Sequence, residues 1–209
     1  MDFKSLRIML LFLVAVASAE GDVISAPAFD EAVRMMYHGK GQMLAAMIDA
    51  LAPGDKSVNV NEQVAMPSTA GGGTVTPLLV SVRAAAQGKS EGLAVARALL
   101  ARDDIDVNLS PVMPSKVKAT PLTMAVYLVE KGRDGAMEIV RSLLARGADV
   151  NAEGMILGGS TATPMWIAAD LLLQKRTKHP DAVADLIELL RKKGGVKHHT
   201  SKSSTKTEL

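Results

Sequence analysis

The stretch TPLTMAVYLVEKGRDGAMEIVRSLLARGADVN, residues 120–151, decides the fold of this chain. Thr120 can cap a helix through its hydroxyl, and Pro121 suits the first helical position, where its missing N–H breaks no hydrogen bond. Apolar residues then recur at helical spacing in two runs, separated by a glycine-containing turn. The second run ends at Arg146-Gly147, where glycine can take the left-handed conformation that often ends a helix. The stretch therefore predicts a helix, a turn, a second helix and a final Ala-Asp-Val-Asn turn.

The same order of residues recurs on both sides of this stretch. Thr76-Pro77-Leu78 leads to LAVARALLARDDIDVN, and Thr163-Pro164-Met165 leads to AVADLIELLRKKGG. The Thr-Pro pairs lie about 44 and 43 residues apart, and such a period indicates stacked structural repeats. A weaker copy covers Ala28–Asn61 and has two candidate terminal turns, Val58-Asn59 and Val60-Asn61.

These residues resemble the ankyrin repeat family, through the Thr-Pro-Leu openings, MEIVRSLLARGADVN and its echo LAVARALLARDDIDVN. The resemblance implies an all-α, ankyrin-like repeat solenoid within residues 20–195. It has about four helix-turn-helix units, at 28–61, 76–108, 120–151 and 163–195. The spacing of about 43 to 44 residues from one unit to the next exceeds the family's repeat length of about 33 residues by about ten. The surplus lies between the paired helices and in loops after each asparagine. A generic bundle of helical hairpins remains the alternative.

One position departs from the family in every clear copy. The histidine that usually follows Thr-Pro-Leu is replaced by Leu79, Thr123 and Trp166. The turn hydrogen bond that the histidine makes in the family is therefore not expected here, although the fold is. Trp166 lies inside a predicted inner helix, where we expect it to be packed.

Residues 1–19 have the features of a secretory signal peptide. Lys4 and Arg7 give a positive start, Ile8–Ala17 is an unbroken apolar run, and Ala17-Ser18-Ala19 has the form of a cleavage site. The run is shorter than the roughly 20 residues that span a bilayer. We expect cleavage and no stable membrane insertion afterwards. An uncleaved membrane anchor is the competing interpretation.

The carboxyl end predicts a location. Residues 196–209 are rich in lysine, serine and threonine, which indicates a disordered basic tail. The last four residues, Lys206, Thr207, Glu208 and Leu209, are similar to the Lys-Asp-Glu-Leu signal that a retrieval receptor reads in the lumen of the endoplasmic reticulum. A carboxyl-terminal PDZ ligand is one alternative. If the organism is bacterial, the protein is instead secreted or periplasmic.

Three loops between the units are candidate binding fingers: Glu62–Val75, Leu109–Ala119 and Ala152–Ala162. Each contains a methionine, namely Met66, Met113 and Met155. Methionine suits adaptable apolar contacts with a partner. The alternative is that these side chains fold back onto a neighbouring finger and close a small core.

The resemblance implies a second binding surface in the concave groove of the stack. The matching positions are Arg83, Tyr127 and Asp170, each seven residues after the threonine of its unit. Together they offer a charge, an aromatic anchor and an acceptor to a protein partner. Each is equally compatible with an ordinary surface residue.

Little in the sequence supports catalysis. The chain has no cysteine, which excludes thiol chemistry and cysteine-based zinc sites. Its four histidines, His38, His179, His198 and His199, form no recognisable catalytic or metal-binding set. The repeats are mildly acidic and aromatics are few, so nucleic-acid binding is not expected. We expect a non-catalytic protein-binding module without cofactor or metal; a small metal-binding protein or enzyme that uses the histidines is a further alternative.

Overall fold

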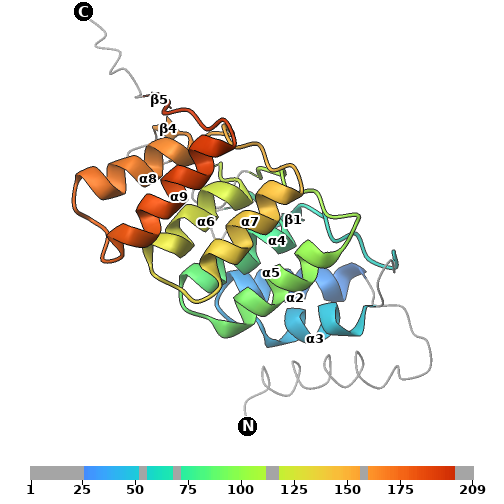
Figure 1. Cartoon of the computed structure of the whole chain (residues 1–209). Coiled ribbons are helices and arrows are strands. Elements are labelled where there is room, and N and C mark those ends of the chain that lie inside the picture. The colour runs from blue at the N-terminus through green and yellow to red at the C-terminus, as the bar shows by residue number, and fades with distance from the viewer. Residues whose placement is uncertain (1–25, 52–55, 68–71, 112–117, 156–159, 201–209) are drawn as a thin grey trace, which may run out of the picture. The chain divides into compact units, whose positions relative to one another are not determined.

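The computed structural model describes residues 26–51, 56–67, 72–111, 118–155 and 160–200, and it is mostly helical (Figure 1). The helices are α2 (Ala26–Tyr37), α3 (Gln42–Ala50), α4 (Pro77–Ala86), α5 (Ser90–Ala101), α6 (Pro121–Glu130), α7 (Ala136–Ala145), α8 (Pro164–Leu173) and α9 (Pro180–Lys192). The short strands are β1 (Val64–Ala65), β2 (Thr74–Val75), β3 (Gly154–Met155), β4 (Thr161–Ala162) and β5 (His199–Thr200). The helices pair as the sequence predicts, one pair to each copy of the repeat.

The helices fall into two compact units. The first contains α2 to α5, and the second contains α6 to α9 together with β2 to β5. In the first unit α2 packs on α3 and α4, and α5 packs on α3 and α4. In the second, α6 contacts α7, α8 and α9, while α8 packs on α9. Each unit therefore buries the apolar faces of two helical pairs.

Aliphatic side chains fill both cores. The largest fully buried side chains of the first unit are Phe29, Met36, Leu44, Leu78, Leu79 and Leu99; those of the second are Leu122, Leu128, Ile139, Leu143, Leu186 and Leu190.

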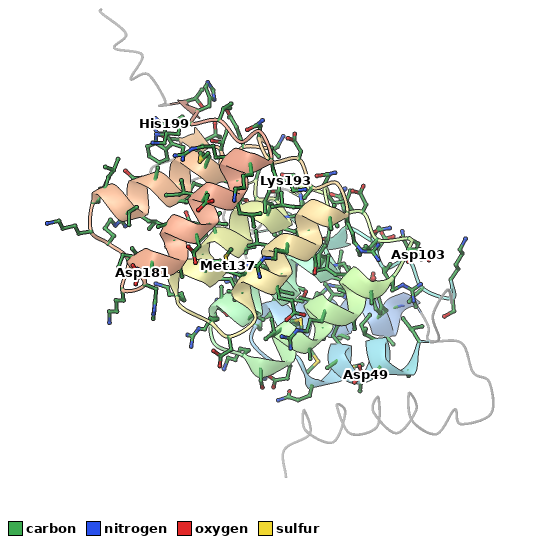
Figure 2. The ribbon with its side chains drawn as sticks, in the orientation of Figure 1. Asp49, Asp103, Met137, Asp181, Lys193 and His199 are labelled. Atoms are coloured by element: carbon green, nitrogen blue, oxygen red, sulfur yellow. The ribbon has the colours of Figure 1, made fainter. Side chains whose placement is uncertain are left out.

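Charged residues at the two ends of α9 favour the helix. Asp181 lies in the first turn (Figure 2), and Arg191 and Lys192 lie in the last turn, so each charge is opposite in sign to its end of the helix dipole.

Threonine begins three of the helices, as the sequence predicts. The hydroxyl oxygens of Thr76, Thr120 and Thr163 accept hydrogen bonds from the backbone N–H three residues on, at 3.3, 3.1 and 3.3 Å. At α6 the bond is reciprocated, because the Thr120 N–H donates to Thr123 Oγ1 at 3.0 Å. Thr123 stands where the family usually has histidine, so a threonine hydroxyl supplies a turn hydrogen bond at that position.

A local hydrogen bond shapes the terminal turn of three copies of the repeat. In each, an Asx side-chain oxygen accepts the N–H of the asparagine two residues on; the pairs are Asn59 with Asn61, Asp106 with Asn108 and Asp149 with Asn151, at 3.0, 2.8 and 2.9 Å. This arrangement is an Asx-turn. It assigns the terminal turn of the weaker first copy to Val60-Asn61.

The three turn asparagines also reach forward to the next turn. Asn61 Nδ2 donates to the carbonyl of Asp104 at 2.7 Å, Asn108 Nδ2 to that of Gly147 at 3.0 Å, and Asn151 Nδ2 to that of Gly194 at 3.2 Å. Asn108 and Asn151 also accept backbone N–H groups of Asp149 and Val196, each at 2.8 Å. One asparagine per turn thus links successive copies of the repeat, and Asn108 and Asn151 do so through both the oxygen and the nitrogen of the side-chain amide.

The prediction of an all-α chain needs a correction, because short strands form in the loops after the asparagines. β1 and β2 form a two-stranded sheet. β3 pairs antiparallel with β4, and β4 pairs antiparallel with β5, with Ala162 opposite both Gly154 and His199. Each strand is two residues long, so it leaves no periodic signal in the sequence.

The predicted disordered tail also needs a correction at its beginning. It was expected to start at residue 196, but Val196–Thr200 are hydrogen-bonded to the second unit and contain β5. We call Val196–Thr200 the C-terminal strap. Residues 201–209, with the predicted retrieval signal Lys206–Leu209, lie outside the described residues, as does the predicted signal peptide 1–19. Among the helices that the structure describes, none is long and apolar enough to cross a membrane.

Candidate partner-binding surfaces

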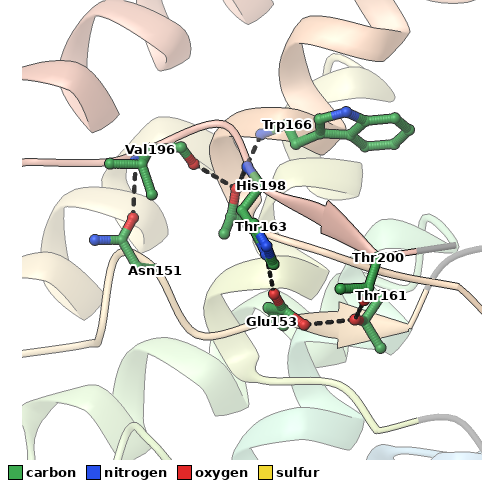
Figure 3. A network of polar contacts seen from close by, with 8 residues as sticks. All are labelled: Asn151, Glu153, Thr161, Thr163, Trp166, Val196, His198 and Thr200. Carbon is green, nitrogen blue, oxygen red and sulfur yellow. Dashed lines mark hydrogen bonds and ion pairs between the residues drawn. The ribbon is translucent and has the colours of Figure 1, made fainter.

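Thr163 holds the C-terminal strap to the start of α8 (Figure 3). Its backbone N–H donates to the His198 carbonyl at 3.0 Å, and its hydroxyl donates to the Val196 carbonyl at 2.5 Å. The same hydroxyl oxygen accepts the N–H of His198 at 3.2 Å and, as the helix cap, that of Trp166. One threonine therefore begins α8 and anchors the chain that follows α9.

Glu153 forms the second attachment of the strap. One carboxylate oxygen pairs with His198 Nδ1, and the other accepts the Thr161 hydroxyl at 2.5 Å. Thr161 in turn contacts the Thr200 hydroxyl across β4 and β5. The Thr161 hydroxyl, followed by His198, lowers the pKa of Glu153 below its ordinary value. Glu153 is therefore a carboxylate at any pH near neutrality.

Trp166 forms the third attachment. Its indole stacks on the His199 ring, with centroids 4.4 Å apart and planes inclined by 14°. Trp166 is half-buried, which agrees with the expectation that it packs. The structure adds its partner, a histidine that the sequence had placed in a disordered tail.

The groove residues Tyr127 and Asp170 lie on α6 and α8 of the second unit. Both are half-buried. Burial raises the pKa of the Tyr127 hydroxyl; Arg176 lowers it, and the nearby carboxylates of Glu130 and Asp170 raise it further. Asp170 also accepts a hydrogen bond from Gln174 at 2.6 Å. An aromatic ring and acidic groups therefore come together here, and their contact with a partner stays a prediction.

Arg83, the third predicted groove residue, lies on α4 in the first unit. Its guanidinium lies over the Tyr37 ring, 4.1 Å from the centroid, and donates to the Tyr37 carbonyl at 2.9 Å. These contacts tie the α2–α3 turn to α4. Arg83 therefore has a structural role inside its unit, besides the binding role that the sequence suggested.

The loop methionines are placed unevenly. Met66 is buried, with 5% of its surface exposed, so it follows the alternative in which the side chain folds inward. Met155 lies on β3, which places its backbone in the sheet. Met113 lies outside the described residues. The finger surface thus rests on Met113 and Met155, and their contacts with a partner remain a prediction.

The histidines show no grouping of the kind that binds a metal. Within residues 26–200, as far as the structure describes them, no group of three or more histidine, aspartate and glutamate side chains is arranged to hold an ion. The His179 ring faces Gly132, where a Cβ would lie 2.4 Å from ring atoms. His38 packs edge-on against Tyr37. Both rings therefore have packing roles.

Sequence reasoning missed the attachment of the strap. Glu153, Thr161 and His198 come from segments far apart in the chain, and none belongs to a motif. One signal was present in the sequence. Gly194-Gly195 follow α9 in the same way as Gly147-Ala148 follow α7, so the residues after Gly195 are expected to form a turn like the one that ends at Asn151.

Residues 118–154 match the family model of the ankyrin repeat. The matched stretch contains α6, α7 and the terminal turn at Asn151, and it supports an ankyrin-repeat protein. Repeats of this family are typically non-enzymatic modules for protein–protein interaction. No curated relative matches the chain.

Proposed function

We propose that this chain, which contains an ankyrin repeat, is a non-catalytic protein-binding module, and that its partner contacts the α6–α8 surface around Tyr127 and Asp170. The observation that carries the proposal is the position of Tyr127, which lies half-buried on α6 of the matched repeat and beside Asp170 of the next inner helix. Tyrosine is a common anchor of interfaces, because its ring gives apolar contact while its hydroxyl hydrogen-bonds.

The finer architecture belongs to this proposal. Four helical pairs, three of which begin with a threonine cap and three of which end in an Asx-turn linked to the next turn, are the expected parts of one repeat solenoid. Such a surface is preformed, so a partner binds it without a large ordering cost. Met113 and Met155 would extend the contact, and Arg83 is a separate candidate contact on the first unit.

A photo-crosslinking experiment tests the binding surface. A photoreactive phenylalanine replaces Tyr127 in the full chain, and captured proteins are identified by mass spectrometry. Tyr127→Ala and Asp170→Asn are then expected to weaken the purified complex about tenfold or more, the loss typical of an interface anchor. Glu188→Gln, on the exposed face of α9, is the matched control. Binding that is unchanged in Tyr127→Ala and Asp170→Asn would exclude this surface.

We further propose that the protein enters the secretory pathway and resides in the lumen of the endoplasmic reticulum. The support is the signal-peptide pattern of residues 1–19 and the likeness of Lys206–Leu209 to the retrieval signal. The test compares the full chain with one that lacks Lys206–Leu209 in a eukaryotic cell. Retention of the first and release of the second are expected. Release of both indicates a secreted protein, and entry of neither shows that residues 1–19 are no signal peptide.

A further inference from the structure

The C-terminal strap is held almost entirely by polar contacts. Its one aliphatic residue, Val196, is 53% exposed, so apolar burial contributes little to its attachment. Its backbone is held by Asn151 and Thr163, through the Val196 N–H and the His198 N–H and carbonyl. The strap leaves α9 through Gly194, whose φ of +83° reverses the chain. A segment with so little buried apolar surface can open locally without unfolding the unit.

Two of the strap's side-chain contacts are made by histidines. His198 meets the carboxylate of Glu153 (Figure 3), and His199 stacks on Trp166. Histidine is the side chain that ordinarily changes charge between pH 5 and 8. A protonated His198 is attracted to the carboxylate, and a protonated imidazole over an indole face gains a cation–π interaction. Both contacts therefore strengthen when the histidines are charged.

The charges around His198 favour this direction. The segment before β3 contributes the carboxylate of Glu153, which is ionised across this pH range. β4 and the start of α8 contribute only the hydroxyls of Thr161 and Thr163. Within the strap, His199 and Lys197 are the neighbouring basic groups, and they repel a protonated His198. The direct contact with Glu153 opposes that repulsion.

We propose that the C-terminal strap is a pH-sensitive clasp, which closes on β4 and Thr163 more tightly in mildly acidic surroundings and opens more often at neutral pH. The direction of this pH dependence follows from the charge of Glu153, because protonation of His198 creates an ion pair with Glu153 in the closed state only. Opening removes β5 from the edge of β4. The uncovered N–H and C=O groups of that edge are then available to another strand.

Hydrogen exchange of the full chain tests the clasp. Protection of the strap amides is measured by mass spectrometry at pH 5.5 and 7.5, after correction for the intrinsic pH dependence of exchange. We expect protection about two- to fivefold higher at pH 5.5, the range for an ion pair this exposed. Glu153→Gln keeps a hydrogen-bonding group but removes the charge, so it should remove the His198 part of the difference and leave only the smaller part that comes from the stack of His199 on Trp166. Glu188→Gln removes a carboxylate from a pair with Lys192 on α9 and should keep it.

The only tryptophan of the chain provides an independent readout. Fluorescence of Trp166 should fall as pH is lowered from 7.5 to 5.5, because a protonated imidazole quenches a stacked indole. His199→Phe keeps an aromatic stack and should remove that step. Far-UV circular dichroism confirms that each variant is folded, and His198→Asn replaces Glu153→Gln if the latter is not. Strap protection that is equal at both pH values, or a pH difference that loss of the His198–Glu153 charge pair leaves undiminished, would overturn the proposal.

Discussion

At the scale of single residues, asparagine and glycine have roles that depend on their particular chemistry: the asparagine side chain both donates and accepts hydrogen bonds, and glycine adopts a positive φ without strain. Asn108 uses both parts of its amide, since Nδ2 donates to Gly147 and Oδ1 accepts from Asp149. The same residue begins the glycosylation sequence Asn108-Leu109-Ser110. A glycan on Nδ2 would crowd the donor that the fold uses, so we expect Asn108 to stay largely unmodified.

Gly132 gives a prediction at this scale. It has a φ of +60°, and an added Cβ would lie 2.4 Å from the His179 ring. Gly132→Ala should therefore lower the free energy of unfolding by about 2 kcal/mol or more, through backbone strain and a steric clash. Urea denaturation measures the loss.

Gly147 is the matched control for Gly132. Its φ is +81°, but no atom lies within 4 Å of an added Cβ, so Gly147→Ala measures the backbone strain alone, about 1 kcal/mol. Equal losses in the two alanine variants would show that the His179 contact costs nothing. Adding His179→Ala should restore part of the stability of Gly132→Ala and none of that of Gly147→Ala.

At the scale of elements, α4, α6 and α8 each begin with a capping threonine followed by proline. At α6 it is strongest, because the caps of Thr120 and Thr123 are reciprocal and both residues are buried. Thr163 has the cap and the strap together, so its substitution would mix two effects. Thr120 is therefore the cleaner site at which to measure the cap.

Thr120→Ala is expected to destabilise the second unit by about 1–2 kcal/mol, because it leaves N–H groups of the first turn without a partner. Thr120→Ser keeps the hydroxyl and should lose less than half as much. Thermal unfolding followed by circular dichroism at 222 nm measures both. A serine variant as unstable as the alanine variant would show that the methyl group, and not the cap, is responsible.

At the scale of the whole molecule, surface carboxylates set the response to acid. Asp104 accepts the Arg102 guanidinium at 2.9 and 3.0 Å, and that hydrogen bond lowers its pKa below the ordinary value. A carboxylate whose folded pKa is depressed stabilises the fold above its unfolded pKa, near 4. The contribution is lost as pH falls through the lower, folded value. Acid should therefore weaken the first unit, which contains this pair.

Asp104→Asn tests this pH dependence. At pH 7 it should cost about 1 kcal/mol, a reduced figure because the Asp104 side chain is 34% exposed. Below pH 4 the difference from the unmodified chain should shrink, since Asp104 itself becomes protonated. Asp185→Asn, on the exposed side of α9, should change little at either pH. A cost for Asp104→Asn that is constant from pH 3 to 7 would contradict the assignment. Urea denaturation at each pH gives the measurement.

The elements that depend on neighbours in sequence were predictable from the residues. Thr-Pro openings, glycine stops and Asx turns each act within about four positions, so the pattern locates α4 to α9 and their turns. The weaker first copy was ambiguous between Val58-Asn59 and Val60-Asn61. The Asx-turn of Asn59 with Asn61, together with the hydrogen bond from Asn61 to the Asp104 carbonyl 43 residues away, decides for Val60-Asn61.

By itself the sequence determined the repeat, because helix caps, periodic apolar faces and turns depend on residues close together in the chain, and the same residues recur in successive copies. The tertiary structure alone decided where Val196–Thr200 lie and what Trp166 meets. Those contacts join residues up to 45 positions apart, through groups as common as a threonine hydroxyl and a glutamate carboxylate. Such groups carry no distinctive pattern, and they acquire a role only when packing of α8 on α9 brings β4 beside the chain that leaves α9.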